Sequence, residues 1–507
     1  LAWALPPWSG WMLKLFLELL LCLAAFYAFF RRRTETTAAA VAATVVFVFN
    51  PAFIRFLPYG TVVGGFAFVA LSLLAVERVF KSPQQGRSIA LLALCLAAML
   101  VTTNLQFALY GLLLVGLWTL WCGYTHRELG GLPIKALLVA GAVAVCLSAV
   151  QLLPSFELVG LTGRDPSKYA GANFIEPAVL ASLWLPLFYG SPAAGTYVGG
   201  ELFFMPPSTT FVLSLGTAAV ALGILGSFAS RAPGRKVLVA LMVAPLAVFV
   251  ASKVPFVLAL LEAIPGYTGM LALRSLVLSY FALALLLAGG IDALAHNDVS
   301  SGARRNWAIV MGVGLLVVVG AMTVTGHTPA QLHWTLPAVI MVSLGLFVLR
   351  GYCSAWVLVG LLSIEAVVLF SARVDRADPN VVYPEHEQIT QVRALMNENG
   401  GRMVGLTERG SFPEFHGDNL PPNTASIFGL SDIRGFVPLS PGHVEQAAAL
   451  VKNPERPAHF LAGLHFDDVS SPWFDAMNVR YALSSRSELG VRWVPVAPGI
   501  FENTKVL

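Results

Sequence analysis

The sequence predicts a polytopic α-helical membrane protein with about 12 transmembrane helices and a small α+β extracytoplasmic C-terminal domain. Hydrophobic residues make up 57% of the 507 residues and charged residues 12%, about half of the usual charged share in soluble domains. Twelve apolar runs fill residues 10–373, and most of the Lys and Arg residues between them fall in alternate connections. After Arg373, charged residues, Pro and Asn return, which indicates a separate domain.

The apolar runs are the candidate membrane-spanning helices. The hydrocarbon core is about 30 Å thick, and a helix needs about 20 residues to cross it. The runs lie at residues 10–30, 36–54, 61–80, 88–104, 106–122, 134–153, 208–229, 236–253, 273–294, 307–326, 335–349 and 354–373. We therefore assign residues 1–373 to the membrane domain and residues 374–507 to the extracytoplasmic domain.

The basic residues between the runs predict the orientation of the chain. If the first run crosses from outside to inside, 14 of them fall in cytoplasmic connections and 5 in external ones. Positive residues are retained in the cytoplasm, so the C-terminal domain is expected outside it. The cytoplasmic set is Arg31, Arg32, Arg33, Arg78, Lys81, Arg87, Arg127, Lys135, Arg231, Arg235, Lys236, Arg304, Arg305 and Arg350. The external set is Arg55, Arg164, Lys168, Lys253 and Arg274.

Two external segments, at 177–190 and 254–265, are apolar but too short to span the bilayer. Pro and Gly residues bracket them, so we expect re-entrant or interfacial pieces. Both lie on the same side as the terminal domain in the predicted topology. Such pieces commonly form the mouth of a cavity for a lipid-borne ligand.

The terminal domain mixes helix and strand patterns. An amphipathic helix is expected at 384–399, and strands at 402–407, 479–484, 492–497 and 500–506. All five cysteines precede this domain, so it holds neither a disulfide nor a thiolate metal site.

The start of the chain suggests that a segment precedes it. The first residue is Leu1, and the first apolar run points from outside to inside. This orientation is more natural for a second helix, so we expect one further helix upstream.

Short motifs spread over nearly the whole chain resemble those of YfhO-type bacterial membrane proteins. They lie at Leu153-Pro154 with Arg164, Leu185-Pro186 with Phe188-Tyr189-Gly190, Tyr197-Val198-Gly199, Leu273-Arg274-Ser275, Asn423 to Ser426, Gly429 to Phe436, and Asn478 to Ser484. That family is grouped with the GT-C glycosyltransferases, which move sugars from polyprenyl-phosphate carriers to acceptors outside the cytoplasm.

The resemblance implies an enzyme of the bacterial cytoplasmic (inner) membrane that uses a polyprenyl-phosphate-sugar donor and an envelope glycan or glycopolymer acceptor. GT-C proteins normally carry a catalytic carboxylate in the first external loop, which would precede Leu1. The family usually has another helix beyond the position of Leu507. No catalytic base can therefore be matched to this sequence, and we treat the catalytic residue as unknown.

Sugar transfer from a lipid phosphate needs cationic groups to hold the departing phosphate. Arginine suits this role, because its planar fork grips two oxygens. Arg274 stands at the outer start of the ninth run, where a lipid phosphate would arrive, or it serves as an interfacial anchor. Arg164 and Lys168 are further phosphate-binding candidates, although exposed loop charges are usually only solvated.

The transfer also needs a general base that takes the proton of the acceptor, and the external carboxylates are the candidates for this role. Glu157 follows the predicted end of the sixth run by four residues. We name it as a weak candidate for the catalytic residue. Glu201, Glu262 and Glu365 are the other cavity candidates. Glu365 lies near the middle of the last run, where an ionisable group must face a polar partner. We favour a structural hydrogen bond to a neighbouring helix over a functional role for this residue.

Other functions predict other patterns. A lipid or polysaccharide transporter or flippase would also be polytopic, yet the paired halves with broken helices typical of transporters are not evident. A non-catalytic envelope assembly protein would rely on its terminal domain.

The histidines form no metal-ligand pattern, and the sequence identifies no cofactor. Whether the protein requires a divalent cation is left open. The net charge of +4 is explained by membrane topology, so no nucleic-acid partner is expected.

Overall fold

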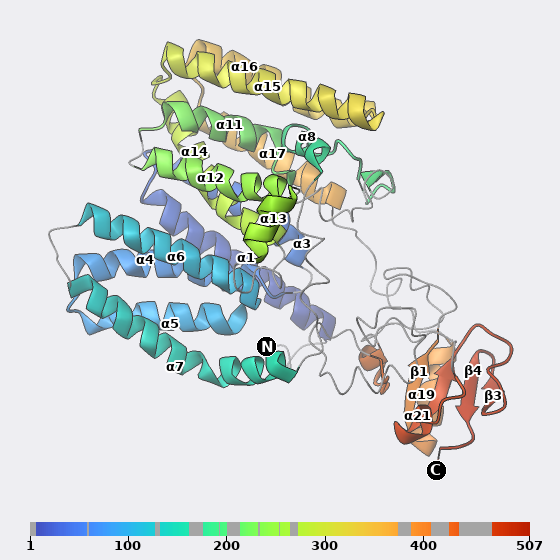
Figure 1. Cartoon of the computed structure of the whole chain (residues 1–507). Coiled ribbons are helices and arrows are strands. Elements are labelled where there is room, and N and C mark those ends of the chain that lie inside the picture. The colour runs from blue at the N-terminus through green and yellow to red at the C-terminus, as the bar shows by residue number, and fades with distance from the viewer. Residues whose placement is uncertain are drawn as a thin grey trace. The chain divides into compact units, whose positions relative to one another are not determined.

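The computed structural model (Figure 1) describes most of the chain. The described residues are 7–57, 60–126, 132–161, 176–191, 193–199, 213–231, 234–252, 254–263, 272–373, 387–406, 425–434 and 469–506. The chain forms two compact units. The first combines Leu1–Gln151 with Pro166–Asp375, and the second combines Leu152–Asp165 with Arg376–Leu507.

The first unit is built of helices, and every predicted apolar run contains one of them. The helices are α1 (Pro7–Arg31), α2 (Thr37–Val48), α3 (Pro51–Phe56), α4 (Val63–Lys81), α5 (Gly86–Thr102), α6 (Leu105–Thr125), α7 (Leu132–Leu161), η4 (Pro177–Leu180), α8 (Ala181–Trp184), α11 (Thr217–Ala229), α12 (Arg235–Ala251), α13 (Pro255–Glu262), η6 (Ala272–Ser275), α14 (Leu276–Ala295), α15 (Ser301–Thr325), α16 (Gln331–Arg350) and α17 (Ala355–Arg373). Helix α7 continues into residues of the second unit.

Among the described residues, 8 helices are long and apolar enough to cross a membrane. The bent pair α12–α13 raises this number to 9, and α2, α5 and α11 are shorter apolar helices. The run at 36–54 is divided because the Asn50 side chain accepts a hydrogen bond from the amide of Phe53 and begins α3, with Pro51 in its first turn. In α11 the helix starts only after Gly216, whose φ is 108°. Twelve spans therefore remain a prediction.

Helix α14 lies at the centre of this unit. Its apolar window is 94% buried, and it packs against α2, α11, α12 and α17. The closest approach is to α11, where a Cβ at Gly226 would overlap the carbonyl of Leu286 and a Cβ at Gly290 that of Leu222. By contrast, only 22% of the apolar window of α15 and 17% of that of α16 are buried, as expected of helices that face lipid.

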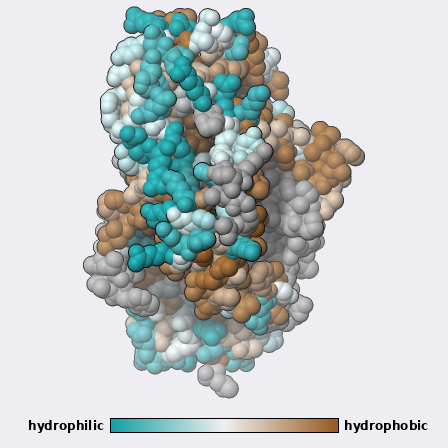
Figure 2. Space-filling view, turned by 90° about the vertical axis from the view of Figure 1, so that its left-hand side faces the viewer, coloured by the Kyte–Doolittle hydropathy of each residue, from teal (hydrophilic) through white to brown (hydrophobic). Residues whose placement is uncertain are grey.

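The polar connections of this unit gather at two ends of the helices. At the basic end, Arg33 pairs with Glu77, Arg231 with Asp298, and Arg304 donates to the carbonyl of Leu349. Hydrophilic side chains form a band over this end (Figure 2). At the opposite end, the Lys14 ammonium donates to the carbonyl of Gly60, and Asn104 N donates to that of Thr61. Thirteen of the 14 predicted cytoplasmic cations belong to described residues at or beside the connections of the basic end, and Arg127 lies outside the described residues.

The terminal unit has a four-stranded sheet in the order β1-β2-β4-β3. Its elements are α19 (Glu387–Asn399), β1 (Arg402–Gly405), η8 (Ala425–Phe428), α21 (Trp473–Ala476), β2 (Val479–Leu483), β3 (Trp493–Ala497) and β4 (Ile500–Asn503). Strand β1 pairs with β2 in parallel, and the other pairs are antiparallel. The four strands coincide with the predicted ones. Residues Met403, Tyr481 and Ile500 pack with Ile389 and Val392 of α19.

Candidate functional site

Arg274 lies in η6, directly before α14, at the end of the helices opposite the basic end. Its Nη1 donates to Gln106 Oε1 at 2.9 Å and to Asn104 Oδ1 at 3.3 Å. Its guanidinium carbon is 5.1 Å and 5.5 Å from the ring centres of Phe56 and Phe107. These amide oxygens and aromatic rings fix the orientation of the guanidinium.

The position of Glu157 corrects the sequence analysis. Helix α7 does not end at residue 153 but continues through Pro154 to Leu161. Glu157 is therefore an exposed residue on the last turns of a helix, not a loop residue past its end. Pro154 removes one backbone hydrogen bond, but the helix continues beyond it to Leu161.

Glu365 is a capping residue in the structure. Its side chain accepts hydrogen bonds from the backbone amides of Thr217 at 2.6 Å and Ala218 at 2.9 Å, where α11 begins. It is 3% exposed. A carboxylate at a helix N-terminus is stabilised by the unpaired amides and by the helix dipole, so the structural explanation accounts for this residue.

The remaining candidates do not join Arg274 in one described site. Glu262 is an exposed residue at the end of α13. Arg164, Lys168 and Glu201 lie outside the described residues. The segment 177–190 forms η4, α8 and a turn that pack on α15, with Tyr189 only 2% exposed. Tyr189 donates to the carbonyl of Ala178, and burial raises the pKa of its hydroxyl.

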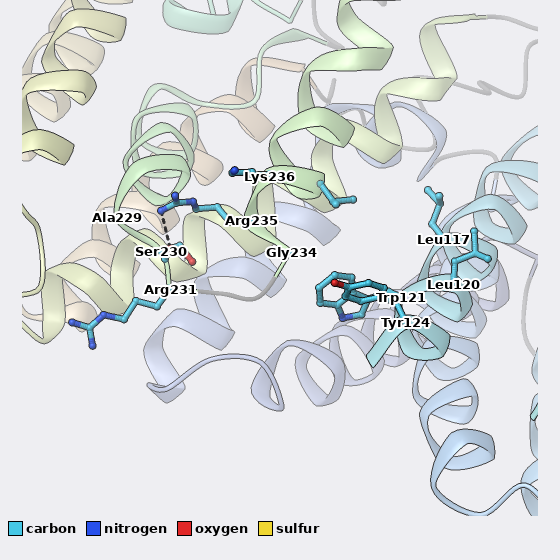
Figure 3. A pocket seen from close by; sticks show the side chains of 11 residues that line it. Leu117, Leu120, Trp121, Tyr124, Ala229, Ser230, Arg231, Gly234, Arg235 and Lys236 are labelled. Carbon is cyan, nitrogen blue, oxygen red and sulfur yellow. Dashed lines mark hydrogen bonds between the residues drawn. The ribbon is translucent and has the colours of Figure 1, made fainter. Parts of the chain in front are cut away.

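A cavity of about 1290 Å³ lies at the basic end, and the sequence analysis did not predict it. Helices α6, α12 and α14 line it together with the ends of α1 and α4. An adjoining cavity of about 930 Å³ shares residues with it. Figure 3 shows the adjoining cavity, with Leu117, Trp121 and Tyr124 across the opening from Arg231 and Lys236. From the sequence, membrane topology alone explains these basic residues.

Ion pairs order the wall of the larger cavity. Glu77 pairs with both Arg33 and Arg32, and the Arg33 guanidinium lies 3.6 Å from the Phe29 ring centre and 4.4 Å from that of Trp118. Burial lowers the pKa of Arg33 to about 9, so this side chain stays charged at neutral pH. Asp292 accepts from the backbone amides of Glu35 and Thr36 and from the Thr36 hydroxyl, which fixes the start of α2.

Within the described part of the chain, no three His, Cys, Asp or Glu side chains are placed to hold a metal ion.

The apolar helices define the class of this chain as a multi-pass α-helical membrane protein with a small C-terminal sheet. No protein-family model, no characterised protein and no solved structure matches the chain.

Proposed function

We propose that this chain is a GT-C type glycosyltransferase that moves a sugar from a polyprenyl-phosphate carrier to an envelope acceptor outside the cytoplasm. It would work in the bacterial cytoplasmic membrane as a YfhO-type protein, with its terminal unit outside. The proposal rests on the motifs shared with that family and on the position of Arg274.

The fixed guanidinium of Arg274 is the observation that carries the proposal. Gln106, Asn104 and two phenylalanine rings hold it at the end of α14, at the depth where a lipid phosphate would lie in the predicted topology. A preorganised cation stabilises charge that develops on a departing phosphate without reorganising first. Near the low-dielectric bilayer this interaction is stronger than in water.

The test is transfer activity in membranes that contain the full-length protein, with a panel of sugar-labelled polyprenyl-phosphate hexoses as donors. Arg274→Ala should reduce transfer by about 2–4 kcal/mol of transition-state stabilisation. Arg274→Lys should retain part of the activity, because its charge remains and its two-pronged geometry is lost. Arg402→Ala removes an exposed cation of the terminal unit, on the same predicted side, and serves as the matched control. Unchanged transfer by a well-folded Arg274→Ala protein would overturn the proposed role.

One observation favours a second candidate, a lipid or polysaccharide transporter or flippase. The helical unit carries a polar site at each end, the cavity at one and Arg274 at the other. Such a protein would move the labelled lipid across vesicles without transferring the sugar, and the same panel of donors distinguishes the two activities.

A further inference from the structure

We infer that the cavity at the basic end binds a lipid that carries an anionic phosphate headgroup. This site lies at the opposite end of the helices from Arg274, and it does not depend on the proposed transferase activity.

The cavity exists because its walls pack on different neighbours. Helix α6 packs mainly on α4, whereas α12 packs mainly on α14. A space is left between α6 and α12, with α14 as its back wall. Along α14 the lining runs from Phe281 to Ala293, a rise of roughly 18 Å for a regular helix. The cavity therefore extends from the helix ends well into the apolar part of the unit.

The mouth of the cavity has an excess of positive charge. The two cavities are lined by seven cations, Arg32, Arg33, Arg78, Lys81, Arg231, Arg235 and Lys236, and by four carboxylates, Glu35, Glu77, Asp292 and Asp298. All four carboxylates have partners, since Glu77 and Asp298 pair with arginines, Glu35 lies beside His296, and Asp292 caps α2.

Two of the cations are available to an anion. Arg78 and Lys81 are exposed at the end of α4, and among the described residues neither forms an ion pair or a hydrogen bond. Basic pockets between membrane helices on the cytoplasmic side are typical sites for anionic lipid headgroups. Phosphate oxygens would satisfy these cations.

The inner part of the cavity favours a lipid over a soluble phosphate compound. Leu114, Leu241 and Phe281 line it, and nothing in a free phosphate would cover them. Exposed apolar side chains continue outward from the same walls, with Leu120 71% and Val237 58% exposed. An acyl chain could therefore pass from the bilayer along this surface, and its burial would add to the affinity.

The experiment measures the anisotropy of an acyl-labelled fluorescent phosphatidylglycerol titrated with the purified full chain in detergent. The double variant Arg78→Gln with Lys81→Gln should bind the probe at least tenfold more weakly, because each cation near an anionic lipid contributes about fivefold. Leu117→Trp should also weaken binding, since it fills the space without removing a charge. Neither change breaks a hydrogen bond or ion pair of the described residues.

Arg87→Gln with Arg350→Gln is the matched control, because it removes two exposed cations outside the cavity. It should leave binding unchanged. Unlabelled phosphatidylglycerol should displace the probe, whereas phosphatidylcholine and millimolar inorganic phosphate should not. Equal losses in the two double variants, or displacement by phosphatidylcholine, would overturn the site. Displacement by inorganic phosphate would identify a soluble phosphate compound and overturn the lipid assignment.

Discussion

Two buried carboxylates of the helical unit share one role, which is to hold the beginning of another helix. Asp292 of α14 receives the amides of Glu35 and Thr36 before α2, and Glu365 of α17 receives those of Thr217 and Ala218 in α11. The first residues of α11 are buried, with Thr217 2% exposed, so a protein group must supply the acceptors for their amides. An acidic residue inside a membrane run is therefore explained here without catalysis.

Glu365→Gln should destabilise the helical unit by about 1–3 kcal/mol, because the amide keeps one acceptor and turns an NH₂ group toward a backbone N–H. The free energy of unfolding in detergent, followed by circular dichroism, measures the loss. Glu262→Gln changes an exposed residue of the same type and should have little effect. If both variants unfold alike, Glu365 does not hold α11.

At the scale of single residues, the sequence predicts which side chains need polar partners but does not identify those partners. The depth of Glu365 in an apolar run implied a polar contact, but Thr217 lies 148 positions away. Glu157 shows the opposite error, because the prediction ends the sixth run at residue 153 although helix α7 continues to Leu161. Arg274 was placed at a helix start from its pattern, but its contacts with Gln106 and Asn104 depend on folding.

At the scale of elements, small residues set how closely the helices approach. Gly223 and Gly226 of α11 face α14 at Leu283, Leu286 and Gly290. Glycines at such contacts allow backbones to meet and increase van der Waals packing. Gly314 of α15 plays a similar part against the Trp184 ring, whereas Gly312 has open space around it.

Gly226→Ala should separate α11 from α14 and destabilise the unit by several kcal/mol, because the new methyl group would meet the backbone carbonyl of Leu286. Gly312→Ala is the matched control: it should be neutral or stabilising by up to about 1 kcal/mol, since alanine favours the helix. Thermal unfolding of the two purified variants in the same detergent compares them. Equal stability of Gly226→Ala and the parent would contradict the close packing.

The sequence predicted a helix in each of the twelve runs because a long apolar segment in a membrane must satisfy its backbone hydrogen bonds internally. It did not predict which helices would be too short to span, since α2 and α11 are bounded by Asn50 and Gly216 inside longer apolar runs. It also missed the cavity at the basic end. The space there depends on α6 and α12 packing on different helices, and no local sequence pattern predicts this packing.

At the scale of the whole molecule, both proposals depend on which side of the membrane each end of the helical unit occupies. The basic end with its cavity is expected in the cytoplasm, and Arg274 and the terminal unit are expected outside. Both proposals require this orientation, because a polyprenyl-phosphate sugar would be used outside and anionic lipid would enter the cavity from the inner leaflet. The uneven distribution of basic residues predicts it.

The most direct test places single cysteines at Gln84 and Ser487, both exposed, in the full-length protein with its native cysteines replaced by serine or alanine. A membrane-impermeant maleimide is applied to intact cells and then to permeabilised cells. We expect the Ser487→Cys protein to be labelled in intact cells, and the Gln84→Cys protein only after permeabilisation. Labelling of the Gln84→Cys protein, and not the Ser487→Cys protein, in intact cells would contradict the orientation.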